Sequence, residues 1–405
     1  MSPVKPIFPL FTVLFLGFFG FSLALPLFPP LFLDQHLTFL PPNTSYQMRR
    51  ILLGILFGMY PLGQFIGAPF LGKWSDKYGR KPILLISLVA LIPAYIGTAL
   101  SIFCMQPLLL FISRFFTGIL EGDIVIAQAA IADVSGDSKT KTKNFGWYIS
   151  LSTTAFFFGP LVGGKLANSH TVAWFHYDTP FWLAAIFSLV SFSVVSLFFR
   201  ETHMADSTIE ISLKSLMRTL LDGLRCRHLK ALFIANFFIF LQIFFFLNFF
   251  SVYLIDIYHF PPAFLGEINA YLTIPIILIS FVFGWLAKMW STKQTTQAGI
   301  FLLVSGCIML LLTQQLWALF LILIPIGFSI GIGFAFPAIL ISNASSQHIQ
   351  GQSLGTNQSI QVFAEACSAL IGGLFLAFFT LIPLYLSILC GLISAYILIR
   401  QVARG

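Results

Sequence analysis

The sequence predicts an all-α protein that crosses a membrane about twelve times, with its helices in two bundles of about six. Three observations predict this class. Hydrophobic residues make up 58% of the chain and charged residues only 9%, against about 25% in soluble domains. Apolar runs of about 20 residues recur along the chain, and that length crosses a bilayer. A polar stretch at residues 201–228 separates the runs into two sets.

The first set of runs comprises residues 8–33, 51–71, 83–103, 108–132, 145–166 and 180–199, and the second comprises residues 229–254, 263–287, 298–312, 317–341, 353–378 and 381–399. We therefore predict an N-terminal bundle at 1–200, a cytoplasmic linker at 201–228 and a C-terminal bundle at 229–405. Basic residues crowd alternate loops, which the positive-inside rule assigns to the cytoplasm together with both termini. Arg49, Arg50 and Lys165 break this pattern, and we expect them at outer helix ends with their charges reaching the lipid headgroups.

Composition also excludes several classes of function. The net charge of +8 comes from short loops between the runs, where cations set topology, so no nucleic-acid binding is expected. The five cysteines have neither disulfide-framework nor metal-site spacing. No nucleophile–base pairing, phosphate loop or metal cluster is found, so the sequence predicts neither an enzyme nor a bound cofactor or metal. We expect a monomer, embedded in the lipid bilayer, that handles a small-molecule substrate.

Residues 72–82 form a charged turn between the second and third runs, reading Gly-Lys-Trp-Ser-Asp-Lys-Tyr-Gly-Arg-Lys-Pro. The bland interpretation is a basic stop-transfer loop. The pattern resembles the signature loop of the major facilitator superfamily, whose members are secondary transporters that alternate between inward-open and outward-open states. The resemblance implies a cytoplasmic latch that links the second, fourth and eleventh helices. Its residues here are Gly72, Asp76, Gly79, Arg80 and Asp133.

The fourth run carries three ionisable side chains, Arg114, Glu121 and Asp123. Each costs at least about 2.5 kcal/mol at the centre of a membrane helix, so such groups usually face a wet cavity or one another. Helical spacing puts Arg114, Glu121 and Gln128 on one face and predicts that Asp123 points the opposite way. That face either lines the transport pathway, or Arg114 and an acid neutralise each other as a packing pair. The Arg-x-x-x-Gly pattern resembles drug/proton antiporters, which implies that Arg114 takes part in proton coupling.

The fifth run contains a Gly-Pro-x-x-Gly-Gly pattern formed by Gly159, Pro160, Gly163 and Gly164. It resembles the antiporter signature of exporters in the same superfamily, and the alternative is a close helix contact without bearing on transport direction. The first half as a whole resembles the tetracycline exporters. Those exporters place an acid in the first helix, where this chain has Gly17 or its apolar neighbours.

The seventh run is crowded with phenylalanine. Gln242, Phe246, Phe249, Tyr253 and Asp256 share one helical face, and an aromatic face with a few polar tips suits an apolar or flat substrate. The alternative is that these rings face lipid or neighbouring helices. The first four of these residues and Gln128 are therefore candidates for a substrate pocket.

The eleventh run places Gln358, Gln361 and Glu365 along one face. The two glutamines complete the set of substrate-pocket candidates. Glu365 lies near the middle of the run and has no basic residue in its own helix. It is therefore a candidate proton carrier or a partner for a cationic substrate, and the alternative is a neutral side chain hydrogen-bonded between helices.

These observations predict a secondary active transporter that exports a small amphipathic compound or drug in exchange for protons. Arg114, Glu121, Asp123 and Glu365 are the candidates for proton coupling. The family resemblance implies a bacterial inner-membrane protein with both termini in the cytoplasm. Two alternatives stay open at this point: an importer of a metabolite or metallophore with the same fold, and a non-transporting membrane sensor or scaffold.

Overall fold

The computed structural model describes residues 7–35, 37–135, 138–168, 172–203, 227–345 and 350–402. Every regular element in these ranges is a helix, so the predicted all-α class is confirmed. Eleven helical segments of the described chain are long and apolar enough to cross a membrane. Most of the predicted linker at 201–228 falls outside the described residues.

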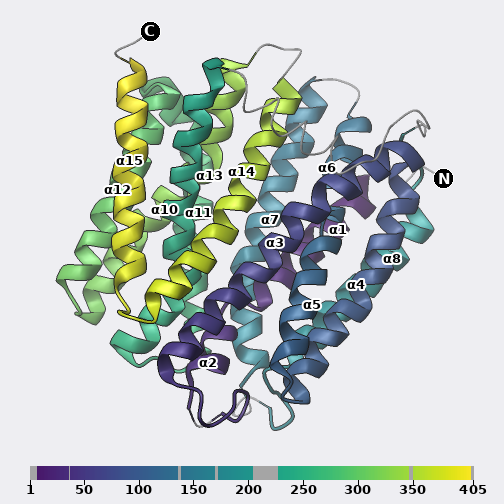
Figure 1. Cartoon of the computed structure of the whole chain (residues 1–405). Coiled ribbons are helices and arrows are strands. Elements are labelled where there is room, and N and C mark those ends of the chain that lie inside the picture. The colour runs from purple at the N-terminus through teal and green to yellow at the C-terminus, as the bar shows by residue number, and fades with distance from the viewer. Residues whose placement is uncertain are drawn as a thin grey trace. The chain divides into compact units, whose positions relative to one another are not determined.

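The helices follow one another in the order shown in Figure 1. In the first half they are α1 (Ile7–Leu23), α2 (Phe28–Leu33), α3 (Tyr46–Tyr78), α4 (Arg80–Phe103), α5 (Pro107–Leu120), α6 (Asp123–Asp133), α7 (Ser138–Leu166) and α8 (Thr179–Phe198). In the second half they are α10 (Arg227–Tyr258), α11 (Pro262–Met289), α12 (Thr292–Leu312), α13 (Leu316–Ala344), α14 (Gln350–Leu376) and α15 (Ile382–Val402).

Two of the predicted spans are each built from two shorter helices. The first breaks between α1 and α2, where prolines begin α2 because a proline nitrogen has no hydrogen to donate to a preceding turn. The fourth breaks at Glu121 and Gly122, between α5 and α6. This break leaves neither half long enough to cross a bilayer alone, and we infer that α5 and α6 cross it together, in addition to the eleven segments above.

The helices pack as two compact units. Unit 1 holds α1, α2, α4 to α8, the part of α3 from Met59 onward and the start of α11 as far as Ala270. Unit 2 holds the start of α3 as far as Gly58, the rest of α11, and α10 and α12 to α15. Both α3 and α11 therefore contribute one segment to each unit.

Unit 1 is organised around α1 and α4. Helix α1 packs against α7 and α8, and α4 packs against α5 and α8. The contact of α1 with α7 is close because a Cβ atom on Gly159 would overlap Ser22, and one on Gly163 would overlap the backbone of Leu23. Small residues at such positions let helix backbones approach in a membrane, where dispersion contacts replace the hydrophobic effect as the driving force.

Unit 2 is organised around α10, which packs against α14 and α15, while α12 packs against α13 and α15. The buried rings of Phe240, Phe244 and Phe245 form the centre of its apolar core. The first segment of α3 is held against α14, because a Cβ atom on Gly54 would overlap the backbone of Gly373. Unit 2 thus includes a helix segment from the first half of the chain.

Our expectation for two arginines in this segment is wrong. Arg49 and Arg50 are 2% and 9% exposed, so their charges do not extend to the headgroups. Arg50 forms an ion pair with Asp256 at 2.5 Å, and Thr380 and the carbonyl of Leu376 also accept from its guanidinium. The partner of Arg50 lies on a helix that is far away in the sequence, so the residues near Arg50 in the sequence do not reveal it. Lys165, the third exception, is exposed, and its reach to the headgroups stays a prediction.

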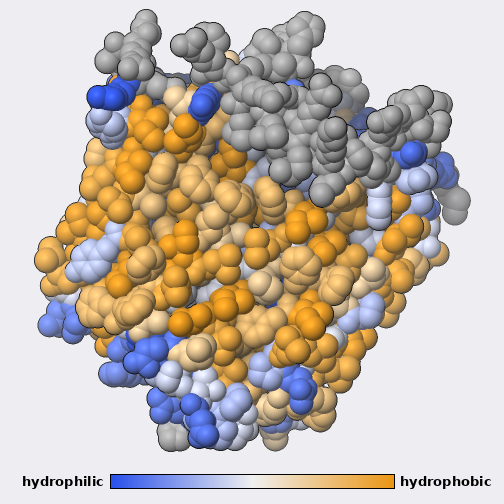
Figure 2. All heavy atoms as spheres, viewed as in Figure 1, coloured by the Kyte–Doolittle hydropathy of each residue, from blue (hydrophilic) through white to orange (hydrophobic). Residues whose placement is uncertain are grey.

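The outer surface suits a lipid environment. On the face seen in Figure 2, hydrophobic residues cover the middle stretch of the helices and hydrophilic residues gather toward the helix ends. Large apolar side chains are widely exposed, among them Phe281 at 82% and Leu312 at 80%. Apolar exposure on this scale would be an aggregation hazard in water but is the normal condition of helices that face hydrocarbon.

Candidate functional site

The break between α5 and α6 places two acids inside unit 1. Glu121 follows the last residue of α5, and Asp123 begins α6. Their side chains are 1% and 2% exposed. The straight helix that we assumed would have turned Asp123 away from Glu121, and this expectation is wrong because the break changes the helical phase. Both acids instead line one small pocket.

Two tyrosine hydroxyls hold the carboxylate of Glu121. Tyr60 of α3 donates to Oε2, and Tyr95 of α4 donates to Oε1. Both tyrosines are buried. Hydrogen bonds from neutral donors stabilise a buried carboxylate without cancelling its charge, so Glu121 keeps the capacity to take up and release a proton. Asp123 is less well satisfied, because its Oδ1 is buried without a hydrogen-bond partner among the described residues.

Arg114 lies on α5, about two helical turns before Glu121, and is 3% exposed. Its guanidinium carbon is 5.0 Å from the ring centroid of Tyr60 and 5.5 Å from that of Phe28, both within the range of cation–π attraction. Within the described chain it forms no ion pair with either acid, and its Nη1 has no hydrogen-bond partner. The alternative of a simple Arg–acid packing pair therefore has no support in this geometry.

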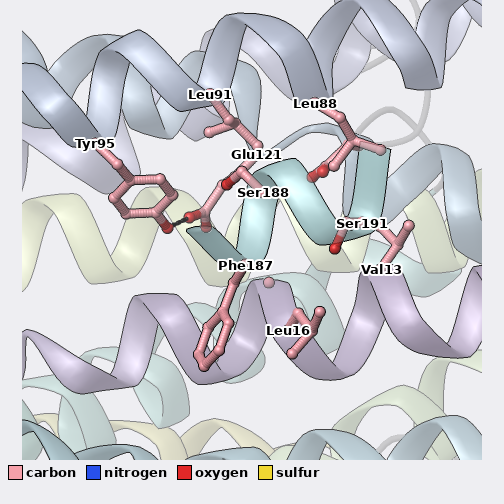
Figure 3. Close-up of a pocket in the computed structure, with 11 residues that line it drawn as sticks. Val13, Leu16, Leu88, Leu91, Tyr95, Glu121, Phe187, Ser188 and Ser191 are labelled. Carbon is pink, nitrogen blue, oxygen red and sulfur yellow. Dashed lines mark hydrogen bonds between the residues drawn. The ribbon is translucent and has the colours of Figure 1, made fainter. Parts of the chain in front are cut away.

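The pocket that contains both acids is lined by α1, α4 and α8 as well as by the break itself. Figure 3 shows the Tyr95 hydroxyl directed at Glu121, with Leu88 and Leu91 on one side and Phe187 on the other. The space admits about one water molecule. It therefore suits a proton carried on water and excludes a drug-sized compound. Gly17 of α1 lines the same pocket.

Three residues of the predicted latch, Asp76, Arg80 and Asp133, form one polar cluster in unit 1, and the role of this cluster as a latch stays a prediction. The Nη1 of Arg80 lies 2.6 Å from Asp76 Oδ1, and its Nε donates to Asp133 Oδ2 at 3.1 Å. The hydroxyl of Ser75 also accepts from Arg80 at 2.7 Å. Gly79 joins α3 to α4 with a φ of 101°, which side chains with a Cβ rarely adopt. The turn between α3 and α4 is thereby tied to the end of α6.

Glu201, just after α8, also belongs to this cluster, although it lies outside the sequence motif at 72–82. Its carboxylate accepts from the backbone N–H groups of Arg80 and Lys81, at 2.9 Å each, and so caps the start of α4. Partial desolvation alone would raise the pKa of Glu201, but hydrogen bonds from the backbone of His203, Lys81, Arg80 and Thr202 outweigh it and hold that pKa below its usual value.

The glycine–proline motif of α7 serves two contacts. Gly159 and Gly163 face α1, as described above, while Gly266 at the start of α11 packs on the Pro160 carbonyl and on Gly164. The motif therefore fixes how α7 lies between α1 and the start of α11. This is the close-contact role, and a link to the direction of transport stays a prediction.

The substrate-pocket candidates on α10 use their polar atoms inside unit 2. Gln242 donates to the Ile300 carbonyl at 3.1 Å, and the Tyr253 hydroxyl donates to the Leu310 carbonyl at 3.0 Å. Phe246 stacks on Phe250, and Phe249 packs on Gly372. These contacts favour the alternative of packing between helices, and a direct role of these four residues in substrate binding stays a prediction.

Helix α14 carries the remaining candidates. Gln358 is exposed, while Gln361 and Glu365 are partly buried. The carboxylate of Glu365 makes no hydrogen bond or ion pair to another described residue. In contrast to Glu121 it has no donors arranged around it, so the structure leaves its role as a proton carrier open. Gln128 of α6 is partly buried and donates to the Tyr148 hydroxyl of α7 at 2.8 Å.

Comparison with known proteins identifies the family. The family model described as Major Facilitator Superfamily matches residues 10–369. The chain belongs to the Major Facilitator Superfamily. It is thus a membrane transporter and not an enzyme, and the sensor or scaffold alternative is set aside.

Named relatives of this transporter are resistance proteins. It is 29% identical over 313 residues to the class B tetracycline resistance protein of Escherichia coli, covering 75% of this chain and 73% of that protein. It is 27% identical over 388 residues to the class H tetracycline resistance protein of Pasteurella multocida, covering 92% of this chain and 88% of that protein. Multidrug resistance protein 1 of Bacillus subtilis is 30% identical over 205 residues, which is 50% of this chain and 47% of that protein.

Solved structures share the transporter's fold. A human organic anion transporter superposes with a TM-score of 0.74 at 18% identity, covering 98% of this chain and 100% of that one. A D-xylose–proton symporter superposes with a TM-score of 0.72 at 16% identity, covering 98% and 97% of the two chains. At these identities the likeness concerns the fold alone.

Sequence reasoning missed the three side chains that complete the transporter's polar clusters, namely Tyr60, Tyr95 and Glu201. A tyrosine inside an apolar run carries little local signal, because an aromatic ring is common in such a run and the partner of its hydroxyl lies on another helix. Glu201 did have a signal. It follows Arg200 at the end of the sixth run, where a charged pair after an apolar stretch indicated a boundary but not a helix cap.

Proposed function

We propose that this transporter exports a small, flat amphipathic drug across a bacterial inner membrane in exchange for protons that enter. The tetracycline and multidrug resistance names of its relatives support the substrate class and the direction. We further propose that the protein is a monomer. We also propose that both termini lie in the cytoplasm, since the basic loops alternate along the chain. The functional division at 1–200, 201–228 and 229–405 remains part of this proposal.

One observation carries the proton coupling. Glu121 is buried in the middle of a membrane-spanning segment with two hydroxyl donors, and no cation of the described residues forms an ion pair with it. A carboxylate in such a place is costly, and functional sites are where that cost is usually retained. The neighbouring pocket has room for about one water molecule, from which the acid would take up its proton.

The position of Gly17 adds independent support. The tetracycline exporters that this chain resembles place an acid in the first helix, and the matching stretch here has Gly17. That glycine lines the same pocket as Glu121 and Asp123. An acid supplied by α5 and α6 in this transporter would therefore occupy the space that an acid of the first helix occupies in the exporters. We infer that the carboxylate has moved between helices while the proton site has stayed in place.

In the proposed cycle, Glu121 takes up a proton when its pocket is open to the outside and releases it when the pocket is open to the cytoplasm. Drug binds in the inward-open state and leaves from the outward-open state. The two states alternate, so a proton moving inward down its gradient drives drug outward. Arg114 contributes by biasing the charge state of Glu121 through the Tyr60 ring that lies between them.

The test is transport by the purified protein in liposomes with an imposed pH gradient and a compound panel that includes tetracycline and ethidium. We expect wild-type protein to move at least one panel compound against its gradient and to lose that accumulation when an uncoupler is added. Glu121→Gln should abolish accumulation and keep downhill exchange, because glutamine mimics a carboxyl that cannot release its proton.

A matched control is Glu267→Gln, a carboxyl of α11 that the proposed cycle does not use. It should accumulate the same compounds as wild type. Insensitivity of wild-type transport to the uncoupler, with dependence on sodium instead, would defeat proton coupling. Accumulation by Glu121→Gln at the wild-type level would remove Glu121 from the mechanism.

A further inference from the structure

Tyr60 lies at a junction of three chemically different groups. Its hydroxyl donates to Glu121, and its ring centroid lies 4.6 Å from that of Phe21 on α1. The guanidinium carbon of Arg114 lies 5.0 Å from the same ring. A single side chain therefore contacts the buried acid, the buried cation and an aromatic neighbour.

The backbone of Tyr60 is held in place while its ring contacts all three groups. The Tyr60 carbonyl packs directly on Gly118 of α5, where a Cβ atom would overlap it. One turn later, Gly63 packs on the Phe115 carbonyl in the same way. Since α3 cannot shift toward α5 without a clash, a change in the contacts of Tyr60 is expected to occur by rotation of its ring and hydroxyl.

Phe21 belongs to a larger group of rings, which we call the ring cluster: Phe18, Phe21, Tyr148 and Phe156. The Phe156 centroid lies 5.9 Å from Phe21 and 5.7 Å from Phe18, and Phe18 lies 6.1 Å from Tyr148. All four are partly exposed. At the far end of the cluster, Tyr148 is hydrogen-bonded to Gln128.

The ring cluster has the chemistry of a site for a planar aromatic compound. Aromatic rings prefer offset or edge-to-face partners at centroid separations of about 4.5–7 Å, and a planar ligand offers such a partner to several rings at once. The pair of Gln128 and Tyr148 supplies a polar end that orients the ligand. A ligand that contacts Phe21 would act directly on the neighbouring ring of Tyr60.

Tyr95 provides the contrast that identifies Tyr60. It donates to the other oxygen of the same carboxylate, from α4. Yet within the described residues it makes no aromatic ring contact, and it lines the small pocket, which Tyr60 does not line. Of these two donors, Tyr60 alone also contacts the ring cluster.

We propose that Tyr60 is the positioning residue that couples a planar aromatic substrate on the ring cluster to the proton on Glu121. A carboxylate accepts from both tyrosines, whereas a protonated carboxyl also has a hydrogen of its own to donate, and in the proposed step the Tyr60 hydroxyl accepts that hydrogen. The proton bonds to Oε2, and Tyr60 keeps its own proton and turns. A substrate stacked on Phe21 resists or favours that turn. The inference rests on the proposed function.

The experiment measures protons moved per drug molecule in liposomes, with tetracycline and ethidium as probes and a pH-sensitive dye in the lumen. Tyr60→Phe keeps the ring and removes the hydroxyl, so we expect the ratio of proton flux to drug flux to fall about 10-fold, the equilibrium effect of losing one hydrogen bond to a charged group. Downhill drug flux should persist, because the aromatic contacts remain.

A double-mutant cycle provides the matched control. Phe21→Leu combined with Tyr60→Phe should be non-additive in the flux ratio, because the two residues act through one contact. Phe21→Leu combined with Tyr95→Phe should be additive, because those two side chains act separately on Glu121. The comparison separates a coupling role from general damage, which would affect both pairs alike.

Two results would overturn the inference in distinguishable ways. If wild-type protein moves neither probe together with protons, the proposed function fails and the inference falls with it. If wild type couples but Tyr60→Phe and Tyr95→Phe change the flux ratio equally and both cycles are additive, Tyr60 has no special role and the proposed function stands.

Discussion

At the scale of single residues, the two glutamates that sequence reasoning selected have unlike surroundings. Glu121 is almost completely buried and accepts two tyrosine hydroxyls. Glu365 is partly buried, and its carboxylate has no hydrogen bond or ion pair within the described chain. An acid with organised donors is equipped to hold a charge, whereas an acid without them depends on water or a ligand.

This difference leads to a prediction for Glu365. If it carries a proton, Glu365→Gln should keep downhill exchange and lose net transport driven by pH. If it does not carry a proton, glutamine replaces it and the dependence of net uptake on pH stays unchanged. We expect the second outcome, since Glu121 is the better-prepared site. Uptake measured across a pH series decides, and a loss of pH-driven transport in Glu365→Gln would contradict us.

At the scale of elements, the break between α5 and α6 is what creates the site. Gly122 is required there, because a Cβ atom would contact Leu71 and the backbone of Ala68 on α3. The resulting close approach of α3 brings Tyr60 within reach of Glu121. Broken helices inside membranes are tolerated where the freed backbone is covered by protein or water, and they commonly mark binding sites.

We proposed that Glu121 takes the place of an acid that related exporters have in the first helix. This can be tested by introducing an acid at Gly17 in a variant that lacks the carboxylate of Glu121. A Cβ atom on Gly17 would meet nothing closer than Ile124 at 3.9 Å, so an added side chain has space at its first atom. We predict that Gly17→Asp restores uncoupler-sensitive accumulation to Glu121→Gln, at least in part. Gly17→Asn in the same background is the matched control and should not restore it, because an amide cannot carry the proton. Equal rescue by both would show a steric effect.

At the scale of the whole molecule, the latch ties together the ends of several helices in unit 1. Arg80 at the start of α4 binds Asp76 of α3 and Asp133 of α6, and Glu201 after α8 caps α4. The Asp76 carboxylate is more than a third exposed, and an ion pair so open to solvent stabilises a protein by only about 1 kcal/mol or less. We therefore expect the Arg80–Asp76 pair to act by positioning Arg80, which is itself buried.

We predict that Asp76→Asn slows transport sharply while the protein still inserts and keeps its melting temperature within a few degrees. The physical reason is that the amide keeps the size of the side chain and removes the charge that orients Arg80. Transport rates and thermal melts in detergent measure the two effects. Near wild-type rates in Asp76→Asn would remove the latch from the mechanism.

Glu201→Gln is the contrasting variant, because Glu201 holds a helix end. The pKa of Glu201 is lowered below its usual value of 4.5 in the folded protein, so its stabilising contribution is present above about pH 4.5 and is lost as the pH falls through the folded value. Wild type should therefore melt at a higher temperature than Glu201→Gln at pH 6, and the difference should shrink toward pH 3. A constant difference would mean that the charge of Glu201 does not matter.

Much of this architecture follows from local properties of the chain. The apolar runs predicted the all-α class and the recurrence of membrane-spanning helices. They succeed because a bilayer selects each segment by its own length and hydrophobicity. Both properties can be read without knowing which helix lies next to which.

The partners of buried charged side chains could not be predicted from these local properties. Glu121 meets Tyr60 and Tyr95, and Arg50 meets Asp256, across 61, 26 and 206 positions of sequence. Each contact depends on which helices pack together and on their rotation, and a break of two residues was enough to turn Asp123 toward Glu121. Helix contacts in a membrane arise from close packing of complementary surfaces, and that complementarity belongs to pairs of helices and not to any one segment.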